Sequence, residues 1–491
     1  MAQKFIHYDK KNGVAYASVY TPQKVNGKKT NNPEYLGRVI NKEKGIYQSR
    51  ARGVFFYNIE DGYADGNFLL PGVEEKLILD FGDIHALYEI LKKTGYLKVF
   101  KAILPVESDS LLSLIGYKVL GSTANCYAFD WWEGSYARIL FPNANIKSQR
   151  LSEFLSKLGD EGVQRHFFKQ YLTHLKIGNS PRGILIDSTG LPNDIHFPLA
   201  ALNTHGGETN REARLILVID RSINMPLYFR YNAGNIVDVT TLKATIDELA
   251  MQGVNTEFAI VDAGYYSEKN VKSLYGDDIA FLTRLIPNRK LYKNLVAEHI
   301  DDLLQAKYML IHNGRLLYIK QVSIDLFGYA GYAYIAVDYE RRNSEISEYV
   351  KKAIEEGETH EEIDAKMRTK GVFILISSEN AATNEILPLY YTRQAVEQIF
   401  DINKNNIDLL PLRTHSEETF RGHLMLAFMS SVAYLLVSKY LKESIFNPIG
   451  AFTILRNLKC KVYDQKILVK EPTKKMKDIA EILDFKLPSL I

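Results

Sequence analysis

Cysteine is nearly absent from this sequence, which contains only Cys126 and Cys460 among 491 residues. The two lie far apart, and neither belongs to a Cys-x-x-Cys pair or a Cys/His cluster. The sequence therefore excludes a disulfide framework and a cysteine-based zinc site. This scarcity favours a reducing compartment, and we expect a cytoplasmic protein.

Long hydrophobic runs are also missing. The first residues, MAQKFIHYDKKNG, contain no apolar signal core, and the longest apolar run, 424–437, has 14 residues that include two serines. Such a run is too short to span a bilayer, so it predicts a buried helix and no membrane partner. With 46% hydrophobic residues, the chain can bury a large core, and its length predicts two to four globular parts.

The sequence has no strong excess of either charge, because its net charge is only +3. Its basic residues are concentrated near the ends. Residues 1–53 contain eleven Lys or Arg against three Asp or Glu, and residues 454–491 contain nine against five. The first segment suits a phosphate-facing surface, although a solvated, solubilising face explains a lone basic run equally well.

Changes in periodicity divide the chain into zones. Short alternating runs between Gly and Asn turns predict a basic, β-rich module over residues 1–60. Amphipathic runs such as DIHALYEILKKTG predict a helical domain over residues 75–175. Short amphipathic helices are mostly core elements, but a helix-turn-helix that reads bases stays an alternative for this domain.

From Gly183 the composition is that of an α/β domain. The runs GILIDST, ARLILVID, MPLYFRY, FAIVDAG and IAFLTRL predict strands, with helices at VTTLKATIDELAMQG and SEKNVKSLYG. Three strands, a helix, a strand, a short helix and a strand is the order expected of a ribonuclease H-like core, a mixed sheet flanked by helices. We therefore predict an α/β fold with the core at 180–290 and 379–440, a β-rich insertion with charged helices at 291–378, and a basic helical region at 441–491.

Two aspartates stand at the ends of predicted core strands. Asp187 closes GILID and Asp262 closes FAIVD, and small or turn-forming residues follow each. Ligands collect at strand ends in open α/β sheets. A buried, unpaired acid costs stability, so each aspartate is solvated, hydrogen-bonded in a turn or held for a metal. For either aspartate taken alone, capping a turn is the better explanation.

The helix predicted over YYTRQAVEQIFDINKN carries four polar side chains on one face. Tyr390, Arg393, Glu397 and Lys404 occupy offsets of 0, 3, 7 and 14 residues. At about 100° per residue they fall within about 60° of one another. An exposed, salt-bridged face explains such a stripe. However, apolar residues such as Val396 occupy neighbouring turns, so the stripe borders the core.

With this stripe the sequence resembles insertion-sequence transposases of the DDE class, in the branch defined by a Tyr-x2-Arg-x3-Glu-x6-Lys signature. Here the signature reads Y-YT-R-QAV-E-QIFDIN-K without a gap. Asp187 in IDSTG and Asp262 in VDAGYYS match the family's first and second acids, and that branch places a β-rich insertion before the glutamate helix. The resemblance covers most of the chain, is best from Gly183 to Met429, and is loose in the N-terminal module.

The resemblance implies a catalytic triad of Asp187, Asp262 and Glu397 that binds two Mg²⁺ ions, for which Mn²⁺ can substitute. Hard cations prefer oxygen ligands such as these carboxylates. Two such ions about 3.5–4 Å apart stabilise both the attacking and the leaving oxygen of a phosphodiester. Three like charges around one point repel each other, so we expect weak metal binding until DNA phosphate completes the coordination.

Four basic or aromatic residues are predicted to contact DNA. The resemblance assigns Tyr390, Arg393 and Lys404 to the DNA near the cleaved bond. Arg393 can fork onto a phosphate, while Lys404 acts as a point charge. Arg284, just after the strand IAFLT, is a further phosphate candidate, for which a structural ion pair is the alternative.

The implied function is DNA transposition in a prokaryotic cell. Such an enzyme binds the terminal inverted repeats of its element and target DNA as double-stranded partners, forms a homodimer in the DNA complex, cleaves the element ends and joins the 3′ ends to the target. The N-terminal module and the helical domain are the candidates for DNA binding. Some relatives carry a tryptophan in the insertion that stacks on a flipped base during hairpin formation. This chain has none after Trp132, so a hairpin intermediate is in doubt unless Tyr or Phe takes that role.

Two other functions stay open at this point. A ribonuclease H-like nuclease that hydrolyses DNA and never joins strands would need the same triad. A non-catalytic DNA-binding protein derived from a transposase is the second alternative, and the presence of all three acids argues against it.

Overall fold

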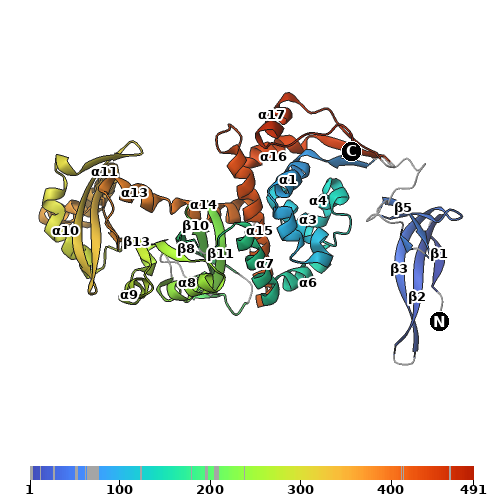
Figure 1. The fold of residues 1–491 in the computed structure, drawn as a ribbon, viewed down its shortest axis with the longest axis horizontal. Coiled ribbons are helices and arrows are strands. Elements are labelled where there is room, and N and C mark those ends of the chain that lie inside the picture. Colours follow the sequence, from blue (N-terminus) through green and yellow to red (C-terminus); the bar gives the residue numbers. More distant parts are fainter. Residues whose placement is uncertain are drawn as a thin grey trace. The chain divides into compact units, whose positions relative to one another are not determined.

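The computed structural model describes residues 4–491 except 12, 26–27, 50–52, 61, 64–76, 122–123, 179, 194–196, 204–209, 237, 408, 411, 413 and 464–465 (Figure 1). The chain forms two compact units. One comprises Met1–Leu97, Val106–Gln149 and Leu436–Ile491, and the other comprises Lys98–Pro105 and Arg150–Leu435. The mixture of sheets and helices confirms the predicted α/β class.

An antiparallel sheet near the N-terminus has six strands in sequence order. They are β1 (Phe5–Lys11), β2 (Val14–Val25), β3 (Lys28–Asn41), β4 (Ile46–Ser49), β5 (Gly53–Asn58) and β6 (Gly62–Tyr63). One face of this sheet has its own buried core, which includes Val19, Tyr47 and Phe55. Successive side chains of a strand point to opposite faces, so the alternating sequence pattern predicted this antiparallel module correctly.

Helices dominate the segment after this sheet, as predicted. They are α1 (Gly82–Lys93), α2 (Tyr96–Lys101), α3 (Ser108–Leu120), α4 (Ala128–Gly134), α5 (Ala137–Leu140), α6 (Ser148–Leu158) and α7 (Glu161–His174). The last of them packs on the α/β unit, because Phe168 of α7 contacts the rings of Tyr228 and Phe229. Helix α7 and most of α6 thus belong to the second unit.

The C-terminal region contains a sheet in addition to helices. Helices α16 (Pro448–Arg456) and α17 (Lys474–Ile482) are accompanied by strands β18 (Lys459–Tyr463) and β19 (Lys466–Val469), and β18 pairs with β7 (Leu77–Asp80). The basic helical region predicted at 441–491 thus contains these two helices and, in addition, a β-hairpin that was not expected. Cys460 and Val462 are buried on either side of the exposed Lys461, which is the alternation typical of a strand. This alternating run is too short to be recognised in the sequence.

The second unit is built on one large sheet. Its strands are β8 (Arg182–Pro192), β9 (Ala201–Asn203), β10 (Asn210–Asp220), β11 (Met225–Ala233), β12 (Thr256–Val261), β13 (Ala280–Leu285), β14 (Met309–His312), β15 (Arg315–Leu326), β16 (Tyr329–Asp338) and β17 (Val372–Ser377). The order is β11-β10-β8-β12-β13-β17-β16-β15-β14, with β9 beside β10. Strands β8, β12 and β13 are parallel, and the other pairs are antiparallel.

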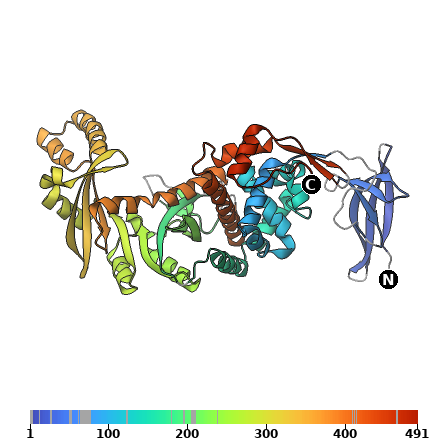
Figure 2. The same cartoon turned by 45° about the horizontal axis from the view of Figure 1, so that its top comes forward.

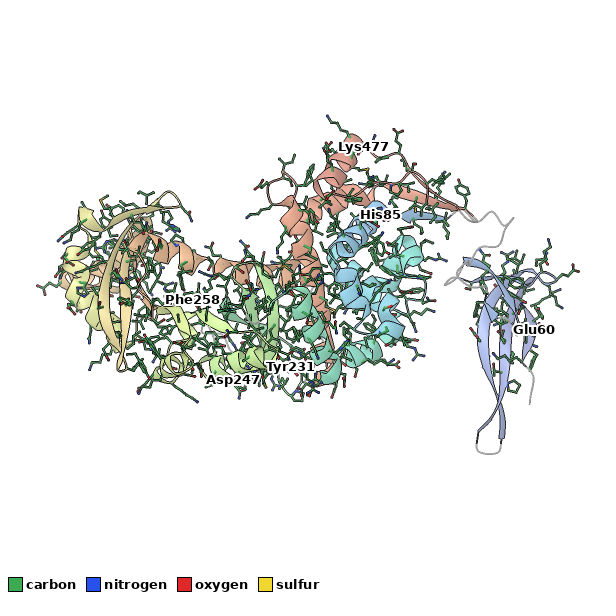
Figure 3. All side chains as sticks on the ribbon, in the orientation of Figure 1. Glu60, His85, Tyr231, Asp247, Phe258 and Lys477 are labelled. Carbon is green, nitrogen blue, oxygen red and sulfur yellow. The ribbon has the colours of Figure 1, made fainter. Side chains whose placement is uncertain are left out.

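Helices cover this sheet on both sides. They are α8 (Leu242–Met251), α9 (Glu268–Gly276), α10 (Lys290–Leu303), α11 (Tyr339–Glu356), α12 (His360–Arg368), α13 (Thr383–Tyr391), α14 (Gln394–Asp401) and α15 (Glu417–Leu441). Helix α14 packs on one face of the sheet, against β8 and β10, and α8 lies on the opposite face (Figures 1 and 2). Figure 3 labels Asp247 on the solvent side of α8 and Phe258 in β12.

The predicted insertion continues the core sheet. Strand β17 pairs antiparallel with β13 of the core and with β16, so the sheet runs without interruption from β11 to β14. The insertion also reaches the glutamate-helix region, because the His312 ring stacks on Tyr391 at 5.3 Å. The sequence showed a change of rhythm after Arg284, but strand pairing between segments about 90 residues apart has no local signal.

The apolar run near residue 430 lies in α15, which has 25 residues. In the described part of the chain, this is the one helix long and apolar enough to cross a membrane, and most of its apolar window is buried in the protein. The prediction of a buried helix is confirmed, although the helix extends well beyond the apolar run. Such burial is typical of a core helix.

Two glycines allow α6 and α15 to approach closely. A Cβ atom on Gly422 would overlap the carbonyl oxygen of Leu155, and one on Gly159 would overlap the carbonyl oxygen of Glu418. Both obstacles are backbone atoms, which cannot rotate away. We therefore expect Gly422→Ala to lower the free energy of unfolding by about 2–3 kcal/mol, as measured by urea denaturation.

Gly276→Ala is the matched control for this substitution. Gly276 ends α9, and a Cβ there meets nothing within 4 Å. The control should be neutral or slightly stabilising, because alanine has the higher helix propensity. Equal stability of Gly422→Ala and Gly276→Ala would contradict the close-approach argument.

Candidate active site

Asp187 and Asp262 lie side by side because of strand register. Strand β12 is parallel to β8, and its last residue, Val261, pairs with Ile186. The next residue on each strand is therefore an aspartate. Asp187 was predicted to end its strand, which is wrong, because β8 continues to Pro192 along its antiparallel partner β10. Only β12 ends at this level, and Asp262 follows it directly, before the short helix η5 (Ala263–Tyr265).

Glu397 approaches the two aspartates from a helix. It lies in the first turn of α14, which packs on β8 and β10, and its side chain is 55% exposed. The predicted uniform helix over the four signature residues is not observed. Helix α13 ends at Tyr391, and around Arg393 the backbone forms bonds three residues apart, such as Val396 N–H to the Arg393 carbonyl.

A second irregularity follows Glu397. Residues Ile402–Asn406 form a π-helical turn, η7, which includes Lys404. Here the buried Asn403 donates from its side-chain amide to the Ile399 carbonyl at 2.8 Å and accepts from Ser431 at 2.9 Å. These bonds replace part of the regular backbone pattern. The angular positions expected from 100° per residue therefore do not hold over the whole stripe.

One guanidinium joins the three acids. Arg393 Nη1 lies 2.8 Å from Asp187 Oδ2 and 3.2 Å from Asp262 Oδ1, and its Nη2 lies 2.7 Å from Glu397 Oε1. Its side chain is only 17% exposed. Carboxyl groups from β8, from the end of β12 and from α14 thus converge within reach of a single planar cation. The positive charge offsets the repulsion that would otherwise separate them.

The acids occupy different environments. Asp187 forms the buried floor, with 13% of its side chain exposed, and accepts a 2.8 Å bond from the Ser188 backbone N–H. Burial raises the pKa of Asp187 to about 6, although Arg393 opposes this shift and Asp262 adds to it. Burial also opposes the charge of Arg393, but the carboxylates outweigh it and raise the arginine pKa. Asp262 and Glu397 are more open to solvent than Asp187.

The four predicted DNA-contacting residues lie at different distances from the acids. The ring of Tyr390 is buried beside Arg393, 5.9 Å from its guanidinium carbon, and burial raises the tyrosine pKa. Lys404 donates a 2.7 Å hydrogen bond to Thr189 Oγ1 instead of reaching the acids. Burial lowers the pKa of Lys404.

Arg284 lies on β13, the strand next to β12 in the sheet. It was expected just after its strand, which is wrong, because it lies inside β13. Its guanidinium packs over the ring of Phe373 in β17 at 5.9 Å. Its charge still acts on the site, since it lowers the pKa of Tyr390 against the effect of burial.

An ion pair behind Asp187 was missed in the sequence. Arg214 in β10 donates to both carboxylate oxygens of Asp238, at 3.0 and 2.9 Å, and to Ser188 Oγ at 2.6 Å. Ser188 is the neighbour of Asp187 in β8, so this pair supports the strand that carries the first acid. A signal was present, because Arg214 is a charge within the apolar run ARLILVID and a buried charge needs a partner. The partner, 24 residues away, had no recognisable spacing.

The donor set suits a hard divalent cation. All three groups are carboxylates, which supply the oxygen ligands that Mg²⁺ and Mn²⁺ take. Among the residues that the structure describes, no three His, Cys, Asp or Glu side chains are gathered closely enough to hold a metal as they stand. The Arg393 guanidinium lies between the carboxylates at the point where they converge. The acids fit a metal in chemistry, and the arginine occupies the space that a cation would need.

One of the comparisons with known proteins identifies a family. A family model described as "Transposase DDE domain" matches residues 178–433, which is just over half of the chain. None of the curated proteins compared with the sequence matches it. Among solved structures, the chain is similar to the piggyBac transposase in a synaptic complex with hairpin DNA, at 10% sequence identity and a TM-score of 0.38, over 78% of this chain and 82% of that one.

Proposed function

The chain belongs to the transposase DDE-domain family, and from this premise we propose that it is a DNA transposase of an insertion sequence. It binds the terminal inverted repeats of its element, cleaves at the element ends and joins the freed 3′ ends to target DNA. The observation that carries the proposal is the convergence of Asp187, Asp262 and Glu397 on one guanidinium. Three acids that are far apart in sequence meet within the matched segment, at the point where β12 ends.

The strand order supports a ribonuclease H-like core. Strands β11, β10 and β8 are antiparallel neighbours, and β12 and β13 continue the sheet parallel to β8. Apart from the three-residue strand β9, three strands, helix α8, a strand, helix α9 and a strand follow one another in the chain, in the order expected from the sequence. The complete match to the Tyr-x2-Arg-x3-Glu-x6-Lys signature supports the assignment to that branch.

The three acids are the proposed metal ligands. When bound, two divalent cations polarise the scissile phosphate and stabilise the attacking and leaving oxygens. Asp187, on the strand that Arg214 contacts through Ser188, is the most buried of the three acids. Asp262 and Glu397 are more exposed, so solvent and phosphate can reach their oxygens.

Arg393 has two roles in this proposal. In the protein alone it is the counter-ion of the acids and competes with metal for them. In the DNA complex its planar guanidinium would contact a backbone phosphate, and metal ions would replace it as the counter-ions of the acids. This exchange supports the expectation that the site binds metal weakly until DNA is present. Tyr390 lines the same site, and Arg284 supplies positive charge behind it.

A strand-transfer assay tests the function. Pre-nicked element ends with free 3′-hydroxyls are incubated with the full-length protein, Mg²⁺ and a supercoiled target, and joined products are resolved on a gel. A transposase yields joined molecules. Nicking of intact ends without any joined product would instead identify a nuclease, and metal-dependent activity of neither kind would identify a non-catalytic DNA-binding protein. Crosslinking of the end complex would test the proposed homodimer.

Lys404 provides a prediction that separates DNA contact from metal binding. It bonds to Thr189 and not to the acids. We therefore expect Lys404→Ala to weaken binding of element ends by about tenfold, as for loss of one charge-assisted phosphate contact. Metal affinity should stay unchanged, since no ligand is altered. Fluorescence anisotropy with labelled ends and calorimetric titration of Mn²⁺ measure the two effects.

Two variants control for other consequences of this change. Lys272→Ala removes the same charge from the surface of α9, where it pairs with Glu268, and should bind ends normally. Thr189→Val removes the hydrogen bond but keeps the lysine, and should have a smaller effect than Lys404→Ala. End binding by Lys404→Ala at the level of the wild type would exclude the phosphate role.

A further inference from the structure

The outer face of the N-terminal sheet is lined with aromatic side chains. The opposite face is the buried core of this module, formed by Ala17, Val19, Leu36, Tyr47, Phe55 and Tyr57. Strand register shows which residues share the outer face. Phe5 pairs with Tyr20, Tyr35 pairs with Ser18, and Tyr16 pairs with Arg38, and directly opposed residues point to the same side. Figure 1 shows β1, β2 and β3 as one layer of adjacent strands.

These rings form two stacked pairs that solvent can reach. The Phe5 and Tyr20 rings lie 5.4 Å apart with planes inclined by 10°, and the Tyr16 and Tyr35 rings lie 6.3 Å apart with planes inclined by 25°. His7 meets the Tyr20 ring edge-on at 5.8 Å. Phe5 is 43% exposed and Tyr35 is 62% exposed. None of the five rings belongs to the core cluster on the other face.

A group of exposed aromatic rings on one face requires a functional explanation, whereas single exposed apolar residues do not. Isolated apolar side chains are common on protein surfaces, whereas contiguous patches mark interaction sites. Here the rings lie on one face of three adjacent strands, and the two ring planes within each stacked pair are nearly parallel. Such an arrangement offers planar surfaces of the size of a nucleobase.

The charge of the module indicates the kind of partner. Residues 1–53 carry eleven Lys or Arg against three acids, so the module suits a polyanion. The exposed Arg38 stands in register with Tyr16 on the aromatic face. Lys11, the last residue of β1, lies on the same face of that strand as Phe5 and Asp9. The apolar rings alone would suit a protein partner, but the excess of positive charge suits a partner that also carries many negative charges.

We propose that the outer face of the β1–β2–β3 sheet binds a DNA strand with unpaired bases, with Phe5, Tyr16, Tyr20 and Tyr35 stacking on bases and the basic residues contacting phosphates. Bases in a duplex are covered by their neighbours, so rings on a flat sheet cannot stack on them. The face therefore selects unpaired DNA over duplex. This inference rests on the proposed function, because an enzyme that opens DNA ends exposes such strands.

Binding by the full-length protein tests the proposal. A fluorescein-labelled oligothymidylate of about 20 nucleotides and a labelled duplex of equal length are titrated by anisotropy in EDTA, so that no cleavage occurs. Tyr35→Ala should weaken binding of the single strand about tenfold, the usual effect of one lost base–ring stack, and leave duplex binding unchanged. Tyr35→Phe should bind as the wild type does.

Two further variants separate stacking from other causes. Tyr35→Leu keeps an apolar side chain without a ring and should bind single strands as poorly as Tyr35→Ala. Tyr339→Ala removes a tyrosine that is 43% exposed at the start of α11, outside this sheet, and should have no effect. The unfolding midpoint of Tyr35→Ala verifies that the variant is folded, and we expect it to match that of the wild type because Tyr35 is exposed.

Three results would overturn the proposal. The first is single-strand binding by Tyr35→Leu at the wild-type level, and the second is an equal loss of affinity for duplex and single strand in Tyr35→Ala. The third is loss of self-association in Tyr35→Ala with single-strand affinity intact, which would assign the face to a second copy of the chain. Metal-dependent nicking of element ends by the wild type is measured separately. If nicking occurs and the ring variants bind normally, only the aromatic-face proposal fails, whereas absence of nicking and joining is a failure of the proposed function.

Discussion

Replacing Asp187 with Asn is expected to abolish metal-dependent cleavage of element ends, with a loss of about 10³-fold or more, because ligands that act as a unit fail together. Asp262→Asn and Glu397→Gln should have the same effect. Asn and Gln keep the shape of the side chain but not the negative charge that holds a divalent cation. Cleavage of a labelled end fragment in Mg²⁺ is the measurement, and full activity of any of the three variants would contradict the assignment.

End binding controls for loss of folding in these variants. Anisotropy in EDTA should give wild-type or tighter affinity for each, because removing a negative charge near a phosphate reduces repulsion. Asp401→Asn is a matched control for the chemistry. It removes a carboxylate from the end of the same helix, at a residue that is exposed, and should cleave normally.

Asp187→Asn also has a pH signature in the metal-free protein. Burial raises the pKa of Asp187 to about 6, so between its ordinary value and 6 the folded state binds more protons than the unfolded state. This group therefore disfavours folding increasingly as pH rises through that window, and the cost is fully present above about pH 6. Asn removes it, so the variant should unfold at a higher temperature than the wild type at pH 7.5 and not at pH 4. Identical midpoints at both values would contradict the pKa shift.

Replacing Arg393 with Ala is expected to uncouple metal binding from catalysis. Without the guanidinium, the acids lose their internal counter-ion and nothing competes with a cation for their oxygens. Calorimetric titration should show Mn²⁺ binding in the absence of DNA that is tighter by about tenfold or more, a difference of about 1.4 kcal/mol. Cleavage should nevertheless fall by about 10²-fold, because the contact to the phosphate is lost.

The same variant should lose stability without metal and recover it with metal. Three repelling carboxylates replace a nearly buried ion-pair network, and breaking such a network costs up to about 3–5 kcal/mol, less here because two of the acids are partly exposed. Mn²⁺ should restore most of the lost unfolding temperature by binding the folded state. Arg230→Ala, which breaks a half-buried pair with Glu248 in β11 and α8, should show no metal-dependent recovery. Unchanged Mn²⁺ affinity in Arg393→Ala would rule out competition.

Much of this site could be predicted before the structure was known. Asp187 and Asp262 were singled out because apolar runs of β-branched residues end or change character beside them, but only the resemblance to DDE transposases assigned them to a catalytic site. Spacing on a helix placed Glu397 and Arg393 on one face, and the resemblance to the family signature implied their roles. Hydrophobic periodicity and short motifs are local properties, so a single sequence contains them.

Other features had no local signal. Asp187 lies within β8 because β10 accompanies it to Pro192, and the end of a neighbouring strand cannot be read from β8 itself. The stripe on the glutamate helix is broken because the buried Asn403 bonds to Ile399 and Ser431, a contact across 28 residues. The pairing of β17 with β13 and the pairing of β18 with β7 likewise depend on partners distant in the chain.

By itself, the sequence determined the kinds of elements, the antiparallel N-terminal sheet, the buried apolar helix and the identity of the acids that we propose bind metal. Only the tertiary structure decided that these acids meet, and that Arg393 lies among them. The physical reason is that composition and periodicity act over a few residues, whereas electrostatic neutralisation depends on distances of about 3 Å between groups brought together by strand register. The place of one guanidinium, between three carboxylates from three elements, is therefore a property of the fold.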